Sequence, residues 1–146
     1  MSYKNNFSKI HNKVLDFYTD LPFNIYDSID TAAKKVIENN ALSAYPVLKD
    51  IIDKDQVKNI IDIGSGGGWF LNSLSSLYPE KKMTGIDFNT VAVDYANNVK
   101  SQLNLNNSFK KADLFNLEYT ESFDFVSSIG VLHHTPDCHL AIRKIS

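Results

Sequence analysis

The chain has 146 residues, of which 43% are hydrophobic and 22% charged, and its formal net charge is −2. This balance is typical of a globular domain and excludes a disordered or fibrous chain. The small negative charge provides no basic surface of the kind that nucleic-acid-binding proteins use, so we expect no nucleic-acid partner. No 18 consecutive residues are apolar, so we also expect no membrane partner.

The N-terminus and the cysteine content predict the compartment. The opening residues, "MSYKNNFSKIHNK", contain no apolar stretch typical of a signal peptide. Cys138 is the single cysteine and is most simply a reduced thiol in a reducing compartment. We therefore expect a cytoplasmic protein.

Residues 1–52 predict an N-terminal helical region. Apolar residues first recur at helical spacing, at Phe7, Ile10, Val14, Phe17 and Tyr18. An aromatic-rich break, "LPFNIY", precedes two further helical stretches at about 29–39 and 41–52. This region either covers a binding site as a lid, using the aromatics of "FYTDLPFNIY", or packs as an extra helical layer.

Residues 53–146 predict alternating strands and helices. Short apolar runs indicate strands at about 59–63, 82–87, 108–112 and 123–129. Two amphipathic helices separate them, one ended by Pro79 and one capped by Asn89 or Thr90. Alternation of this kind is typical of an α/β fold with a parallel sheet.

A further helix is expected near the end of the chain, in "TPDCHLAIRKIS". Thr135 can cap it, Pro136 can occupy its first turn, and Asp137 can lie at the positive end of the helix dipole.

Four glycines, Gly64, Gly66, Gly67 and Gly68, follow the first predicted strand in "DIGSGGG", residues 62–68. Such a turn either is merely flexible or lets a ligand lie against bare backbone. A dinucleotide fingerprint needs a third glycine where Trp69 stands, and a phosphate loop needs a lysine that is absent. Neither phosphate-binding template fits.

Three later segments have an order and spacing that narrow the choice. They are "GIDFN" at 85–89, "ADLF" at 112–115 and "FDFVSSIGVLHHTPD" at 123–137. Together with the glycine turn, they resemble class I S-adenosylmethionine-dependent methyltransferases from about residue 57 onward. The resemblance implies a Rossmann-like doubly wound parallel sheet, here incomplete, with about four strands in the order 3-2-1-4. The implied cofactor, S-adenosylmethionine, contains no phosphate.

The resemblance also implies roles for individual residues. The methionine part of the cofactor would lie over Gly64 and Gly66, with its amino end ordered by Asp62. Asp87 would bind the ribose hydroxyls, 23 positions after Gly64. The remaining predicted cofactor-binding residues are Phe88, Asp113 and Leu114 around the adenine, together with Ser65, Gly68 and Ser128. Asp87 has an alternative role as a helix cap, and Asp113 an alternative role as a turn former.

Methyl transfer requires mainly positioning and exclusion of water, so the sequence need not show an acid-base pair. His133 and His134 are weak candidates for a general base, and their alternative role is to shape the loop after the fourth strand. Their spacing with Cys138 and His139 fits no standard zinc template, so we predict no metal. The segment "SSIG" lacks the Asn/Asp-Pro-Pro motif of amino-group and adenine methyltransferases, which favours a small-molecule acceptor.

Methyltransferases of this class have seven strands, whereas only four fit in this chain. We therefore expect that the chain is part of a longer protein, or that a partner chain covers strand four. Two alternative functions stay open at this point. One is a noncatalytic S-adenosylmethionine-binding module that needs a partner, and the other is a nicotinamide-dependent oxidoreductase.

Overall fold

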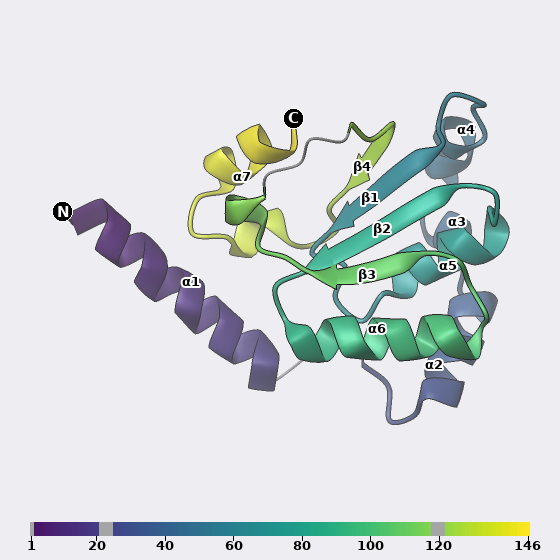
Figure 1. Ribbon diagram of the computed structural model, residues 1–146, viewed down its shortest axis with the longest axis horizontal. Helices are drawn as coiled ribbons and strands as arrows, with labels where there is room; N and C mark the ends of the chain where they lie inside the picture. The colour runs from purple at the N-terminus through teal and green to yellow at the C-terminus, as the bar shows by residue number, and fades with distance from the viewer. Residues whose placement is uncertain (1, 21–24, 118–121) are drawn as a thin grey trace.

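A computed structural model describes residues 2–20, 25–117 and 122–146 of the chain (Figure 1). Its helices are α1 (Ser2–Asp20), α2 (Ile29–Glu38), α3 (Ala41–Ala44), α4 (Lys49–Ile52), α5 (Trp69–Leu77), α6 (Thr90–Gln102) and α7 (Cys138–Ile145). Its strands are β1 (Asn59–Ile63), β2 (Lys82–Asp87), β3 (Ser108–Lys111) and β4 (Phe125–Ser127). Short 3-10 helices are η1 (Pro46–Leu48), η2 (Leu114–Asn116) and η3 (Leu132–His134).

The four strands form one parallel sheet in the order β3-β2-β1-β4 (Figure 1). This confirms the predicted fold class and strand order. β1 is a central strand, and its residues from Ile60 to Ile63 are buried. A central parallel strand is covered on both faces, which is why "NIIDI" is nearly continuously apolar rather than alternating.

The two faces of the sheet belong to two apolar clusters. Ile60 points into a cluster with α5 and α6, which includes Leu71, Leu74 and Ala96. Ile61 and Ile63 point the opposite way, toward a cluster that includes Ala141 of α7. Side chains alternate between the faces of a strand, so α5 and α6 cover one face and α7 covers part of the other.

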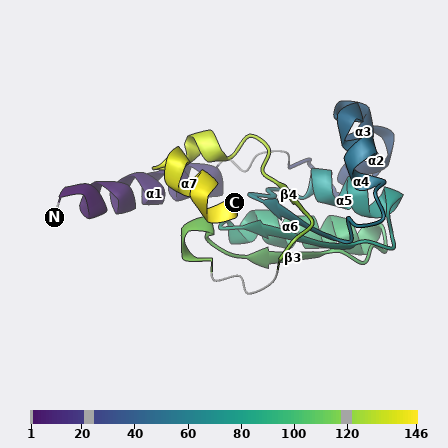
Figure 2. The same ribbon diagram turned by 90° about the horizontal axis from the view of Figure 1, so that it is seen from above.

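The N-terminal helices do not behave as one layer. Ala32 and Val36 of α2 pack against Val99 of α6, and Ala41 of α3 and Ile52 of α4 lie in the main core. By contrast, α1 projects away from the sheet in both views (Figures 1 and 2). The predicted boundary at residue 53 stays a prediction. Part of the aromatic segment predicted as a lid, residues 21–24, lies outside the described residues.

Trp69 connects the N-terminal helices to the sheet. Its indole Nε1–H donates to the carbonyl of Asn39 at 2.9 Å, and its ring packs against the clusters that hold α2 and α3. This explains the residue that stands where a dinucleotide fingerprint would have glycine.

The single helix expected at 41–52 is wrong, because the segment is divided into α3, η1 and α4. Pro46 has no N–H to donate and disfavours helical angles in the residue before it. Tyr45 accordingly has φ −132° and ψ 72°. The last two strands are also shorter than expected, at 108–111 and 125–127.

The predicted start of α7 needs correction. Asp137 is the N-cap, since its carboxylate accepts the N–H of Leu140 at 2.8 Å, and the helix begins at Cys138 after Pro136. Thr135 instead ends η3, where its hydroxyl donates to the carbonyl of Leu132. The capping of α6 by Asn89 is confirmed, since its side chain accepts the N–H of Val91.

Candidate functional site

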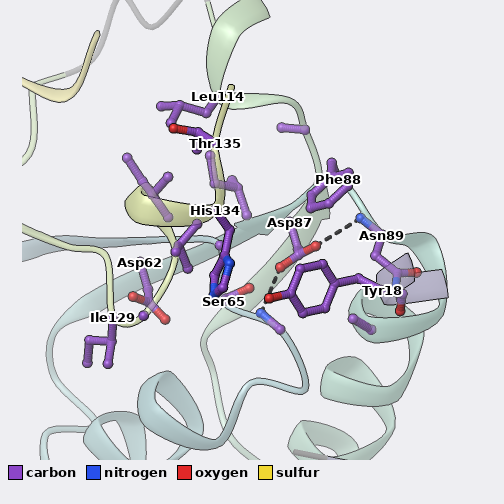
Figure 3. Close-up of a pocket in the computed structure, with 18 of the residues that line it drawn as sticks. Tyr18, Asp62, Ser65, Asp87, Phe88, Asn89, Leu114, Ile129, His134 and Thr135 are labelled. Atoms are coloured by element: carbon purple, nitrogen blue, oxygen red, sulfur yellow. Dashed lines mark hydrogen bonds between the residues drawn. The ribbon is translucent and has the colours of Figure 1, made fainter. Parts of the chain in front are cut away.

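A cavity of about 470 Å³ opens at the carboxyl ends of the strands (Figure 3). It is bordered by the glycine turn after β1, the end of β2, the segment before and within η2, and the loop after β4. Val14 and Tyr18 of α1 also line it, as do Tyr45 and residues of α5 and α6. Ligands of doubly wound sheets bind at this end of the strands, so the cavity lies where the topology predicts a site.

The glycine turn is built from residues in the left-handed region of backbone space. Gly64, Gly66 and Gly68 have φ angles of 73°, 50° and 76°. A Cβ on Gly64 would lie 2.5 Å from a methyl group of Val131, and one on Gly68 would lie 2.8 Å from the ring of Phe109. A Cβ on Gly66 would meet nothing within 4 Å. Two glycines therefore permit close packing, and the third leaves backbone open to the cavity.

Asp87 closes β2 and holds the glycine turn in place. Its carboxylate accepts the N–H of Gly66 at 2.8 Å and the N–H of Asn89 at 2.9 Å (Figure 3). Burial raises the pKa of Asp87, although the backbone N–H groups of Asn89, Gly66 and Phe88 partly oppose this. A carboxylate has about four acceptor positions, so these bonds leave capacity for a ligand in the cavity.

Asp62 is the more deeply buried acid of the site, with 3% of its surface exposed. Burial raises its pKa to about 7, the hydroxyl of Ser127 at 2.7 Å opposes the shift, and the charge of Asp87 adds to it. Asp62 is thus poised between its neutral and charged forms near neutral pH. A cation in the cavity would favour the charged form.

His133 and His134 lie in η3 and line the same cavity. Their ring centroids are 3.9 Å apart, and the ring of His134 meets the ring of Tyr18 edge-on at 5.8 Å. Figure 3 shows His134 between Asp62 and Asp87. The two histidines therefore lie inside the site. The sequence alone left open whether they act as a general base or shape the loop after the fourth strand.

A family model described as a methyltransferase domain matches residues 54–146, well over half of the chain. The chain belongs to this methyltransferase family. The match confirms the predicted family.

Individual relatives agree with this assignment. A ribosomal RNA small subunit methyltransferase G of Macrococcus caseolyticus is 35% identical over 83 residues, which are 54% of this chain and 35% of that protein. A tRNA U34 carboxymethyltransferase of Aliarcobacter butzleri is 30% identical over 125 residues, 80% of this chain and 36% of that protein. The methyltransferase chain thus spans about a third of the length of these curated relatives.

Among solved structures, coclaurine N-methyltransferase bound to N-methylheliamine and SAH superposes with a TM-score of 0.64 at 17% identity. The match covers 99% of this chain and 47% of that one, so the shared fold includes the N-terminal helices. Among the described residues, no helix has the length and apolar content needed to cross a membrane.

The expectation of no nucleic-acid partner is wrong. Four curated relatives of this methyltransferase chain are named for ribosomal RNA or tRNA. The net charge of −2 is a sum over the whole chain, and such a sum does not report local basic surfaces. Composition therefore could not exclude this class of acceptor.

Most of the predicted cofactor-binding residues line the one cavity. These are Asp62, Gly64, Ser65, Gly66, Gly68, Asp87, Phe88, Asp113 and Leu114. The carboxylate of Asp113 caps η2, where it accepts the N–H of Phe115, which is the alternative role as a turn former. Its role toward the adenine stays a prediction. The buried hydroxyl of Ser65 has no hydrogen-bond partner within the described parts of the chain.

Ser128 is the exception, because the lining of the cavity does not include it. Its hydroxyl donates to the carbonyl of Ile63 at 3.0 Å. The neighbouring Ser127, which sequence reasoning missed, contacts Asp62 instead. Ser127 reaches Asp62 because the register of β4 on β1 pairs these two residues. The sequence does not reveal this register.

Tyr18 and Asn89 also contribute in ways that the motifs did not indicate. The side-chain amide of Asn89 donates to the backbone carbonyl of Tyr18 at 2.7 Å while its oxygen caps α6. This hydrogen bond joins α1 to the rim of the cavity, and it spans 71 positions in sequence.

Proposed function

We propose that the cavity binds S-adenosylmethionine and that the protein transfers the methyl group of this cofactor to an acceptor. The observation that carries the proposal is the open backbone at Gly66, flanked by the buried carboxylates of Asp62 and Asp87. The bound cofactor would supply a methyl group on a positively charged sulfur. Two carboxylates suit a ligand that has an ammonium group, a sulfonium and two ribose hydroxyls, but no phosphate.

The residues fit the parts of this cofactor in order along the cavity. Gly64 and Gly66 would contact the methionine part, and Asp62 would accept from its ammonium group. Asp87 would accept from the ribose hydroxyls with the capacity that its backbone bonds leave free. Phe88 and Leu114 offer apolar surface to the adenine, and both line the cavity.

The same carboxylates argue against a nicotinamide dinucleotide. Its pyrophosphate would bring negative charge to a turn that already has two buried acids beside it, and like charges repel strongly in a low dielectric. Trp69 moreover fills the third-glycine position with a ring that packs against the N-terminal helices.

We propose that α1 acts as a lid over this site. Tyr18 lines the cavity and its ring contacts His134, and Asn89 ties the end of α1 to α6. A lid that excludes water favours transfer of the methyl group to the acceptor rather than to solvent. His133 or His134 would accept a proton from the attacking group, since both face the cavity.

For the acceptor, we propose RNA as the class to test first. The support is that four curated relatives are named for ribosomal RNA or tRNA. The likeness to coclaurine N-methyltransferase is at 17% identity and concerns the fold alone, so small molecules form the second arm of the test.

Isothermal titration of the chain with S-adenosylmethionine, S-adenosylhomocysteine and NAD tests the cofactor. We expect micromolar binding of the first two and none of NAD. Incubation with methyl-labelled S-adenosylmethionine and either total RNA or a small-metabolite extract then tests the acceptor. Binding of NAD without binding of S-adenosylmethionine would contradict the proposal. Cofactor binding with no labelled product in either arm would favour a noncatalytic binding module.

A further inference from the structure

The hydroxyl of Ser127 lies between two acceptors. Ser127 in β4 is the register partner of Asp62 in β1, and both side chains are buried, with 7% and 3% of their surfaces exposed. The hydroxyl oxygen is 2.7 Å from Oδ1 of Asp62 and 3.3 Å from the carbonyl oxygen of Ile61. A serine hydroxyl has one proton, so it can donate to only one of these acceptors at a time.

The choice between the acceptors depends on the protonation of Asp62. When Asp62 is ionised, it has no proton to donate, and Ser127 must donate to it. When Asp62 is protonated, its own O–H can donate to the oxygen of Ser127, whose hydroxyl then turns to the carbonyl of Ile61. Both arrangements leave each proton hydrogen-bonded, and they differ by the proton of Asp62 and by rotation of the Ser127 hydroxyl.

The surroundings place this choice near neutral pH. Burial and the charge of Asp87 raise the pKa of Asp62 to about 7, against the hydrogen bond from Ser127. The other titratable groups lining the cavity come from five segments around it: Tyr18 of α1, Tyr45 after α3, Asp87 of β2, Asp113 before η2, and His133 and His134 of η3. A cationic group bound against Asp62 would shift it toward the ionised form.

We propose that Ser127 is a positioning residue that exchanges its hydrogen bond from Ile61 to Asp62 when a ligand ammonium group binds. In this step the O–H bond of Asp62 breaks, its proton leaves to water, and the Ser127 hydroxyl rotates to donate to the carboxylate. The proposal rests on the proposed function, because the ammonium group is that of S-adenosylmethionine. Ser127 is thereby added to the residues that take part in ligand binding, beyond the glycine turn, Asp62 and Asp87.

The exchange is tested first without any cofactor, by following the Asp62 carboxyl carbon in ¹³C NMR as a function of pH. Removing the donor in Ser127→Ala should raise the pKa of Asp62 by roughly one unit. Ser127→Thr retains a hydroxyl and should titrate like the unsubstituted chain. Ser75→Ala is the matched control, because Ser75 is a buried serine of α5 whose hydroxyl donates to Asn106. It should not shift the titration.

The second test measures binding of S-adenosylhomocysteine, which has the same ammonium group, at pH 6 and pH 8. If only ionised Asp62 binds, Ser127→Ala should weaken binding about tenfold at pH 6 but only about twofold at pH 8. A purely structural role of Ser127 would weaken binding by the same factor at both values. Ser127→Thr and Ser75→Ala should bind with the affinity of the unsubstituted chain at each pH.

An unchanged Asp62 titration in Ser127→Ala, or an equal loss of affinity at pH 6 and pH 8, would overturn the role of Ser127. The proposed function fails separately. If the unsubstituted chain binds no S-adenosylhomocysteine at pH 8, S-adenosylmethionine binding is refuted, while a shifted titration in Ser127→Ala would still support the exchange between Ser127 and Asp62.

Discussion

The pKa values of aspartates shift in opposite directions at the two ends of the sheet. At the amino end, Asp124 accepts the N–H groups of Lys58 and Asn59, and these bonds lower its pKa. Hydrogen bonds from Lys49 and Tyr78 likewise lower the pKa of Asp53. At this end the protein itself provides the partners that ionised carboxylates need.

At the carboxyl end, burial raises the pKa of both Asp62 and Asp87. No lysine or arginine is among the described residues that line the cavity around them. Buried acids without a cationic partner destabilise a fold, so the two buried acids at this end are best explained by a ligand that supplies a positive charge. Strained or unfavourable groups of this kind concentrate at functional sites.

The largest expected effect tests whether the acids at the carboxyl end bind a ligand. It is the loss of cofactor binding in Asp87→Ala. Two hydrogen bonds to a charged acceptor, at about 1.5–3 kcal/mol each, correspond to roughly a thousandfold weaker binding. Isothermal titration with S-adenosylmethionine measures this. Asp87→Asn, which retains one acceptor oxygen, should lose less and serves if the alanine variant does not fold.

The matched control is Asp124→Ala at the amino end, which should bind the cofactor with unchanged affinity. Equal losses in the Asp87 and Asp124 variants would show that the two ends do not differ in function.

A second comparison lies within the glycine turn. Gly68→Ala would place a Cβ 2.6 Å from the Cβ of Ala96 at φ +76°, and overpacking with left-handed strain should lower the free energy of unfolding by about 3 kcal/mol. Gly66→Ala meets no atom and should cost only about 1 kcal/mol. Denaturant unfolding measures both.

Gly66→Ala, which costs less stability than Gly68→Ala, should have a large effect on cofactor binding. Gly66→Ala should lose binding although it remains folded, because its methyl group would occupy the cavity. Retained binding in folded Gly66→Ala would contradict the assignment of the methionine part to this backbone.

The last expected effect is a gain in stability in Asp62→Asn. Since the pKa of Asp62 is about 7 when folded and near 4 when unfolded, the folded chain holds a proton that the unfolded chain releases between these values. Stability is therefore lost as pH rises from about 4 to 7. Asn avoids the buried charge, and after the cost of burying its amide we expect a gain of about 2 kcal/mol at pH 8.

At pH 4 the gain should disappear, because Asp62 is then neutral in the folded chain. Urea unfolding at the two pH values checks this, and a gain that is the same at both would show that charge burial is not its cause.

Sequence reasoning located the elements whose signals are local. The glycine turn, the capping of α6 by Asn89 and the strands β1 and β2 depend on neighbours within a few residues. Where two local signals competed, the prediction failed. Thr135 and Asp137 are both good caps, and Asp137 caps α7 while the hydroxyl of Thr135 donates to the carbonyl of Leu132.

The sequence by itself determined the α/β class and the position of the acids at strand ends, because periodicity, glycine and turn chemistry are encoded in contiguous residues. The strand order followed only from the resemblance to a methyltransferase family. Only the tertiary structure decided that Ser127 rather than Ser128 reaches Asp62, that Asn89 ties α1 to the cavity, and that Gly66 alone among the motif's left-handed glycines faces open space. Each of these depends on the register and packing of segments distant in sequence, and one residue of register moves a side chain to the other face of a sheet.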